Sequence, residues 1–354
     1  MNITINDIEK SQKELLFSLS PEDMKPYVEA AADRLGKDLK VKGFRDGKVP
    51  PSVVVQAFGK ETLWNEASAD AIEESYAKAV TEHDIQPIGR PRVDITKLVA
   101  DNDFEFKVTI PCDPPVELPD YKSIAAKVVS DEAKNDVAID EHEVEETLSL
   151  IQNSRTTKGE DGTEVKPELN DEFAKSLGGF KDLEELKTSV REGITKEKEQ
   201  AKAETTRLKI VEGIRKKAKM EISDLLIANE LDKMQDEMVS RISSMGTSVE
   251  EYLSQIGKTM DEVREGWKEK ALERVQTALI LRRIADAEGI EPDEKQVEED
   301  ANAYLRQFGE PEEANKAVSP ELLRTYIRGM LRNEKVFAFL EGKDTDVPSD
   351  ETSN

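Results

Sequence analysis

The spacing of apolar residues predicts strands at both ends of the first 112 residues. Apolar and polar residues alternate in two runs, whose apolar members are Leu15, Phe17 and Leu19 in the first and Phe104, Phe106, Val108 and Ile110 in the second. A period of two is typical of strands that bury one face. We therefore expect strands to open and close this part of the chain.

Two helices are predicted between these strands. Ser20 is a good cap, Pro21 suits the first helical position and two acidic residues follow, so a helix should run toward Asp38. A longer helix is expected over residues 61–82, and the turn before Pro87 ends it. Strands, helices and strands in this order predict an α+β domain over residues 1–112.

A proline-rich stretch follows this domain. Four prolines fall within nine residues: Pro111, Pro114, Pro115 and Pro119. Each lacks an amide donor and restricts the residue before it, so an extended linker is predicted over residues 113–123. Ile124, Ala126 and Val128 then alternate with other residues, which predicts one more short strand.

Helical spacing dominates the rest of the chain. Apolar residues three or four apart form three stretches: Leu183, Leu186, Val190 and Ile194; Ile227, Leu231, Met234, Met238 and Ile242; and Met260, Val263, Trp267, Ala271 and Val275. Such spacing places the apolar side chains on one face of a helix. Residues 124–342 are therefore predicted to form a mainly α-helical domain.

Two final helices are expected, one from about Pro292 and one after the cap Ser319 and Pro320. The inner face of the last helix is predicted to carry Leu323, Ile327, Met330, Phe337 and Leu340. The remaining residues, 343–354, are polar and acidic, which predicts a disordered tail.

Composition narrows the choice of function. The formal net charge is -25, so most of the surface would repel nucleic-acid phosphates or an anionic membrane. We expect no DNA partner, no membrane partner and a cytoplasmic protein, because no stretch is long and apolar enough to span a bilayer. Charged residues make up 36% of the chain and aromatic residues 5%, which favours an elongated, helix-rich shape. Cys112 is the only cysteine, so it is predicted to be a small packing residue.

One short segment is basic, whereas the chain as a whole is acidic. Residues 34–48 carry six basic and two acidic side chains, and GFRDG lies within them. Gly43 and Gly47 permit a tight turn that could display Phe44 and Arg45 for stacking and for pairing with phosphate or carboxylate groups. An ordinary turn with Phe44 tucked into the domain is the alternative. A phosphate-binding P-loop does not fit, because the glycines are too close and Val49 stands where a hydroxyl is needed.

A longer match gives this segment a context. VKGFRDGKVPPSVVVQAFG at residues 41–59 resembles the signature of bacterial trigger factor, a ribosome-associated chaperone, and the similarity extends to IPCDPPVELPDYKSI and ELNDEFAKSLGGFKDLEELKTSVRE. The resemblance covers nearly the whole chain. It implies a ribosome-binding α+β domain followed by an elongated, mainly α-helical chaperone domain with arms.

The resemblance also implies a docking role for the loop. The family docks beside the exit tunnel of the large ribosomal subunit through a Phe-Arg-Lys triplet, and Phe44 and Arg45 match its first two residues. Asp46 stands where the lysine is expected, which would weaken or rearrange docking, and Lys42 and Lys48 could partly compensate. The predicted docking residues are Lys42, Gly43, Phe44, Arg45, Asp46, Gly47 and Lys48.

One family domain has no room in this chain. Trigger factors usually carry an FKBP-type prolyl isomerase domain between a connector helix, here ending at Gln152, and the segment that begins at Glu168. Only residues 153–167 lie between them, whereas a folded domain needs about 50 residues or more. A short loop is predicted there. His83 and His142 lie in separate segments without a nucleophile pattern, so no catalytic residue, metal site or cofactor is expected.

The predicted function is ATP-independent holding of nascent polypeptides at the ribosome, to assist their folding. Adaptable contacts to clients are predicted at Met220, Met245 and Met260, since methionine suits promiscuous apolar binding. The expected partners are ribosomal protein and rRNA at the exit tunnel and unfolded nascent chains, and a homodimer away from the ribosome stays open. A prolyl isomerase with a reduced site and a ribosome-independent helical scaffold are the alternatives.

Overall fold

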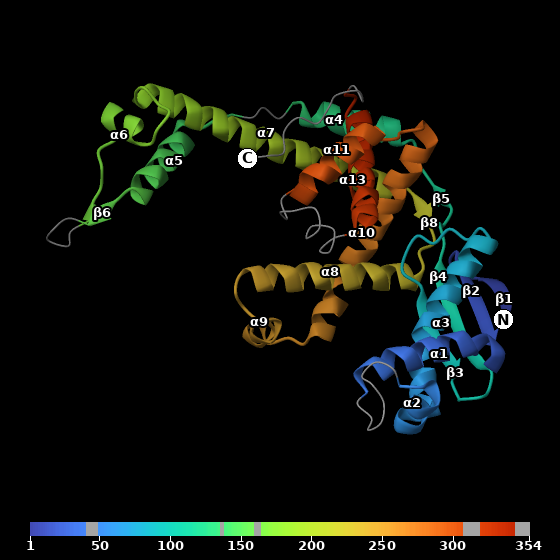
Figure 1. The fold of residues 1–354 in the computed structure, drawn as a ribbon. Coiled ribbons are helices and arrows are strands. Elements are labelled where there is room, and N and C mark those ends of the chain that lie inside the picture. Colours follow the sequence, from blue (N-terminus) through green and yellow to red (C-terminus); the bar gives the residue numbers. More distant parts are fainter. Residues whose placement is uncertain (40–48, 135–137, 159–163, 307–318, 344–354) are drawn as a thin grey trace. The chain divides into compact units, whose positions relative to one another are not determined.

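The computed structural model describes residues 1–39, 49–134, 138–158, 164–306 and 319–343 (Figure 1). The chain forms two compact units, each built from two stretches of sequence: residues 1–117 with 219–279, and residues 118–218 with 280–354. The domain division expected at residues 112–124 stays a prediction, because grouping by contacts does not define what folds or acts independently. The predicted disordered tail lies outside the described residues, apart from Lys343.

The first unit contains a four-stranded antiparallel sheet. Its strands are β1 (Asn2–Ile8), β2 (Gln12–Leu19), β3 (Arg92–Lys97) and β4 (Phe104–Pro111), in the order β1-β2-β4-β3. Phe17 lies opposite Phe106 in the β2–β4 register, and their rings stack with centroids 4.6 Å apart. The apolar residues predicted on the buried face of β2 and β4 are all buried, although Thr109 in β4 is buried as well and breaks the alternation there.

Three helices accompany this sheet: α1 (Pro21–Asp38), α2 (Pro51–Phe58) and α3 (Lys60–Glu82). Both predicted helices are confirmed, and Ser20 and Asp23 form a reciprocal capping box at the start of α1. Trp64 on α3 is 4% exposed and belongs to one core with the sheet residues Leu15 and Phe104. Cys112 packs against this core, as expected of a small packing residue.

The first unit also includes a long helical segment from later in the sequence. Its elements are β8 (Lys219–Met220), α8 (Asp224–Ser244), α9 (Val249–Ile256) and the part of α10 (Met260–Glu288) that ends at Leu279. β8 pairs antiparallel with β5 (Val116–Glu117), so the segment is hydrogen-bonded to the chain that leaves the sheet.

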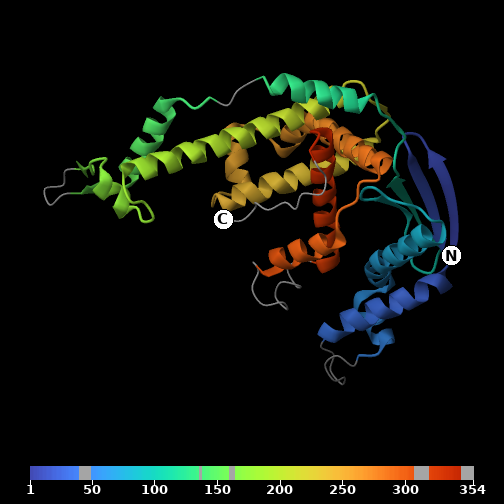
Figure 2. The ribbon, with the colours of Figure 1, turned by 90° about the horizontal axis from the view of Figure 1, so that it is seen from above.

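The second unit is mainly helical. Its helices are α4 (Tyr121–Glu132), α5 (Glu141–Ser154), α6 (Asp171–Ser176), α7 (Leu183–Arg215), α11 (Glu294–Arg306) and α13 (Pro320–Leu340), together with the end of α10. Figure 2 shows α5 and α6 beside the beginning of α7, where Phe173 and Leu186 share one apolar cluster. The α+β class of the N-terminal part and the helical class of the remainder are confirmed.

The strand predicted over Ile124, Ala126 and Val128 is wrong, because these residues belong to α4. Asp120 caps this helix by accepting a hydrogen bond from the Ser123 amide, and Ala125 is buried. Ile124 lies so close to Gly213 on α7 that a Cβ added to Gly213 would be 2.9 Å from the Ile124 Cγ2 atom. Packing against a neighbouring helix therefore outweighs a short alternation of apolar residues.

Two smaller expectations need correction. Met330 was predicted on the inner face of the last helix, but it is 45% exposed, and Leu331, four residues after Ile327, is buried instead. The loop predicted over residues 153–167 is shorter than expected, because α5 continues to Ser154 and β6 (Thr157–Lys158) pairs with β7 (Glu164–Val165). Residues 159–163 lie outside the described part of this segment.

Candidate functional site

The predicted docking residues fall between α1 and α2. All seven, from Lys42 to Lys48, lie outside the described residues. Their role and the alternative of Phe44 tucked into the domain both stay predictions. What the structure describes is the framework on either side of them.

The two helices that flank the docking segment, α1 and α2, pack against each other. α1 ends at Asp38, and the main-chain amides of Val53 and Val54 donate hydrogen bonds to the Pro50 carbonyl at the start of α2. A Cβ added to the buried Gly36 would lie 3.2 Å from Val54 Cγ2, so α1 and α2 approach each other closely. The chain thus enters and leaves the docking segment at two helices in direct contact.

Part of the basic segment is already engaged within this domain. The Arg34 guanidinium donates hydrogen bonds to Asp70 at 2.7 Å and to the Glu66 carbonyl at 3.3 Å, both on α3. Lys37, one turn further along α1, is exposed. Arg34 therefore contributes to the packing of α1 on α3, while half of its side chain stays exposed.

The three methionines predicted to contact clients lie in different surroundings. Met245, at the end of α8, is 76% exposed. Met220 packs against the apolar cluster that contains Ile222 and Leu226, and Met260 is half-buried at the start of α10. Met245 is therefore the most exposed of the three. Their role in binding stays a prediction.

Helix α9 is a candidate client surface that the sequence reasoning missed. None of its eight residues, all of which the structure describes, is buried, and Tyr252 and Ile256 are 36% and 41% exposed. Its signal was readable: Ser248 and Glu251 form a capping box, apolar residues recur three and four apart, and Gly257 ends the helix with a positive φ of 65°. An amphipathic helix without a buried face can offer apolar side chains to a partner.

Ion pairs brace the helices on either side of α9. Arg264 on α10 bonds to Asp232 and Gln235 on α8, each at 2.7 Å. Ten residues further along α10, Arg274 pairs with Glu230 and Glu237. The hydrogen bond from Arg274 holds the pKa of Glu237 below its usual value. These contacts fix α8 against α10 without filling the surface around α9.

The beginning of α8 packs against the sheet domain. Ile88 and Val116 pack in one apolar cluster with Leu226 and Leu279, and the Lys10 ammonium lies 2.9 Å from Asp224. A Cβ added to Gly89 would lie 2.7 Å from Asn229 Nδ2, 3.1 Å from Leu226 Cδ2 and 3.2 Å from Pro111 Cγ, so a side chain here would displace the Asn229 amide and crowd its neighbours. Within the first unit, the sheet and α8 are therefore directly packed.

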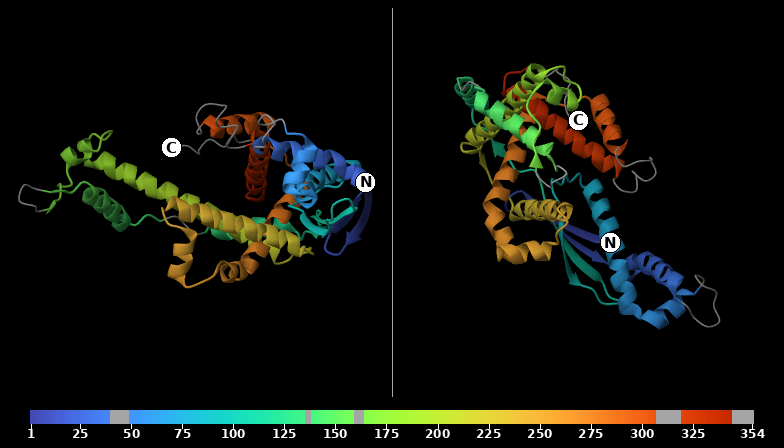
Figure 3. Two further views of the ribbon diagram at one scale, coloured as in Figure 1. Left: turned by 60° about the horizontal axis from the view of Figure 1, so that its bottom comes forward. Right: turned by 90° about the vertical axis from the view of Figure 1, so that its left-hand side faces the viewer.

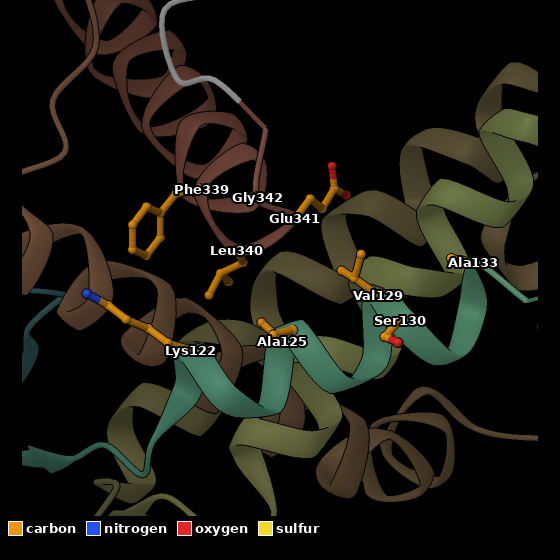
Figure 4. A pocket seen from close by; sticks show the side chains of 10 residues that line it. Lys122, Ala125, Val129, Ser130, Ala133, Phe339, Leu340, Glu341 and Gly342 are labelled. Atoms are coloured by element: carbon orange, nitrogen blue, oxygen red, sulfur yellow. The ribbon is translucent and has the colours of Figure 1, made fainter.

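The second unit contains an apolar hollow of about 490 Å³. It lies between α4 and the end of α13, and Figure 4 shows Ala125 and Val129 facing Phe339 and Leu340 across it. Its size suits one or two apolar side chains of a bound peptide.

Polar contacts fasten the helices around this hollow. The Tyr121 hydroxyl donates a short hydrogen bond to Glu288, and Lys122 pairs with the same carboxylate at 2.8 Å. Burial, aided by the bond to Glu288, raises the pKa of Tyr121 to about 12. On the α13 side, Arg207 Nε lies 2.9 Å from Glu341. These bonds tie α4 to the end of α10, and the end of α13 to α7.

No group of three or more His, Cys, Asp or Glu residues within the described part of the chain could hold a metal ion. His83 and His142 are both exposed. Of the helices described, none is long and apolar enough to cross a membrane.

Comparison with known proteins gives one consistent result. Residues 1–151 match the family described as Bacterial trigger factor protein (TF), and residues 182–341 match Bacterial trigger factor protein (TF) C-terminus. The trigger factor of Clostridium botulinum is 24% identical over 430 residues, covering 98% of this chain and 100% of that protein. The trigger factor of Halothermothrix orenii is 26% identical over 385 residues, covering 84% of this chain and 88% of that protein.

A solved structure of the trigger factor chaperone has the same fold, with a TM-score of 0.52 and 19% sequence identity over 97% of this chain and 99% of that one. Fold and sequence together define the class of a ribosome-associated chaperone. The chain belongs to the bacterial trigger factor family.

The alignment with the clostridial relative is longer than this chain. It extends over 430 positions, although this chain has only 354 residues. More than 70 positions of the alignment therefore have no counterpart here, which is the size of a small domain. This agrees with the few residues available between Gln152 and Glu168.

Proposed function

We propose that this chain docks beside the exit tunnel of the large ribosomal subunit, on ribosomal protein and rRNA, and holds nascent polypeptides there without ATP. The match of both parts of the chain to the trigger factor family carries the proposal. Such a protein works in the cytoplasm, where translating ribosomes are found. Sedimentation of the free protein tests whether it forms a homodimer away from the ribosome.

Phe44 and Arg45 carry the docking step in this proposal. A guanidinium pairs with phosphate or carboxylate groups in a planar, two-pronged geometry, and an aromatic ring beside it can stack on a base or an apolar side chain. The local charge of residues 34–48 favours rRNA or an acidic protein surface, although the chain as a whole is acidic. Asp46 opposes this attraction, so docking is weaker than with a basic residue at that position.

Exposed apolar side chains carry the holding step. Met245, Tyr252 and Ile256 are well exposed around α8 and α9, amid a surface rich in charge. Contacts of this kind are weak and nonspecific, so clients can leave without an energy-consuming step. The glycine-containing segment at residues 43–49 does not fit the pattern of a phosphate-binding P-loop.

The proposal includes the absence of FKBP-type prolyl isomerase activity, because the segment between α5 and α6 is too short for a folded domain. The test is the rate of cis/trans exchange in a proline-containing test peptide. No acceleration above the uncatalysed rate is expected at micromolar protein. Clear turnover would show that another part of the chain has taken over the activity.

Docking is tested by co-sedimentation with empty ribosomes. The double variant Phe44→Ala/Arg45→Ala should bind about tenfold more weakly than the wild type, as expected for loss of an aromatic and an arginine anchor. A matched control, Tyr252→Ala/Lys258→Ala, removes an aromatic residue and a basic residue at the other candidate surface and should bind normally. Equal binding by the wild type and the docking variant, or binding by neither, would refute the docking assignment.

A further inference from the structure

Helix α13 is apolar on two faces, of which one is buried. Leu323, Ile327 and Leu331 pack against α11 in a single cluster, and Figure 3 shows the two helices side by side. The second face carries Leu322, Tyr326 and Met330, whose side chains are 72%, 66% and 45% exposed. Three large apolar residues on one exposed face are more than the isolated ones that ordinary surfaces carry.

The exposed residues are four positions apart and therefore form a continuous row along the helix. We call Leu322, Tyr326 and Met330 the α13 ridge. A parallel row of shorter side chains runs beside it, made of Thr325, Gly329 and Asn333. A Cβ added to Gly329 would meet no atom of the described residues within 4 Å. A ridge next to a shallow groove is the surface that packs against another helix.

The same face already makes a helix contact further along. Phe337 follows Met330 by seven residues and so lies on the same side of α13. Its ring is 5.1 Å from the Arg207 guanidinium of α7. The α13 ridge is thus the uncovered continuation of a face that packs within the unit.

Charge around the ridge favours an uncharged, apolar occupant. Two arginines of α13 are already paired with α11. Arg324 bonds to Glu298 and Arg328 bonds to Glu294, at 2.7–3.0 Å. The groove residues beside the ridge are neutral. Glu321 and Glu334 stand at the two ends of these rows, and Glu334 pairs with Arg207, so the surface provides apolar contact and shape between two acidic ends.

The area is too small for a stable dimer with a second copy. Even an aromatic side chain buries no more than ~250 Å². Three side chains that are 45–72% exposed thus contribute less than the ~800 Å² per partner that a stable interface needs. A contact of this size suits transient binding of a client.

We propose that the α13 ridge binds client segments that have already folded into an amphipathic helix, by helix-to-helix packing. This inference rests on the proposed holding function and names a client class for a surface apart from α9. It gives the chaperone one place for extended, unfolded chain and another for helices that lack their tertiary partners.

The test uses two fluorescent peptides of identical composition. One has leucines spaced for an amphipathic helix, and the other has the same residues scrambled so that no helical face forms. The variant Leu322→Ser/Tyr326→Ser should bind the helical peptide about tenfold more weakly than the wild type and the scrambled peptide equally well. Leu208→Ser is the matched control, because Leu208 on α7 is also 72% exposed, and it should leave both affinities unchanged.

Several outcomes would overturn the inference. Equal affinity of the wild type for the two peptides would leave the holding function intact and remove the helical client class. The same loss with Leu208→Ser would show that any exposed apolar residue suffices. A change in sedimentation of the free protein with Leu322→Ser/Tyr326→Ser would identify a second copy as the occupant. Failure of the wild type to bind either peptide would refute the holding function as well.

All substituted side chains are exposed, so unchanged melting curves are expected and serve as the folding control.

Discussion

The Asn229 Nδ2 amide on α8 donates a 3.0 Å hydrogen bond to the main-chain carbonyl of Arg90. This bond joins α8 to the chain that leads into β3, next to the glycine where the two segments touch. Since Asn229 and Arg90 are 139 residues apart in sequence, a late helical segment and the sheet domain form one packed body.

A first prediction concerns this junction. Gly89→Ala should lower the free energy of unfolding by about 1–3 kcal/mol, because the new methyl group would overlap Asn229 and crowd Leu226. Thermal or urea unfolding measures the change. Gly266→Ala is the control, since its Cβ would meet open space in α10 and alanine favours the helix, so stability should stay equal or rise. Equal effects of the two substitutions would contradict the close approach at Gly89.

A second prediction concerns the brace between α8 and α10. Arg274 lowers the folded-state pKa of Glu237, so the pair stabilises the fold above the unfolded pKa of about 4.3 and loses this effect as the pH falls through the folded value. Glu237→Gln should therefore lower the melting temperature at pH 7 and change it little at pH 3. Glu265→Gln removes an exposed pair with Lys268 within α10 and should have a smaller effect. A loss that is constant across pH would point to packing instead of charge.

A third prediction concerns Asp46. Asp46→Lys removes a negative charge and adds a positive one within residues 34–48. The affinity for empty ribosomes should therefore increase, and it should decrease more steeply as salt is added. Binding at several salt concentrations measures both effects. Asp33→Lys makes the same change of charge on α1, outside the docking segment, and should change affinity less. An equal gain from both would show that net charge alone governs binding.

A fourth prediction concerns α9. Tyr252→Ser/Ile256→Ser should weaken the ability of the chain to keep an unfolded test protein from aggregating, by severalfold in the concentration required, because two exposed apolar contacts are lost. Light scattering during dilution from denaturant is the measurement. Leu16→Ser is the control, since Leu16 is 40% exposed on the sheet. Full activity of the α9 variant would exclude this helix as a main client surface.

Much of the fold could be predicted from sequence because local signals agreed with packing. Helix α1 has its cap, proline and early acids in order, and it runs over the predicted residues. The strand predicted at Ile124 was wrong because Gly213, 89 positions later, offers that side chain a place to pack. Such a long-range contact cannot be recognised from the local sequence pattern.

The candidate site could be predicted only in part. GFRDG is a local pattern and was readable, whereas the junction at Gly89 depends on residues brought together by the fold. The exposure of Met330 was likewise unpredictable, since spacing cannot tell which of two apolar faces of α13 a neighbour covers.

The central claim is that the chain docks through Phe44 and Arg45 and then holds the emerging polypeptide. The most direct measurement places a photo-reactive amino acid at Tyr252 and illuminates ribosomes that carry an unfolded nascent chain. We predict a crosslink to the nascent chain that disappears in the Phe44→Ala/Arg45→Ala background. A crosslink of equal yield in that background, or from the same probe placed at Leu16, would contradict the account.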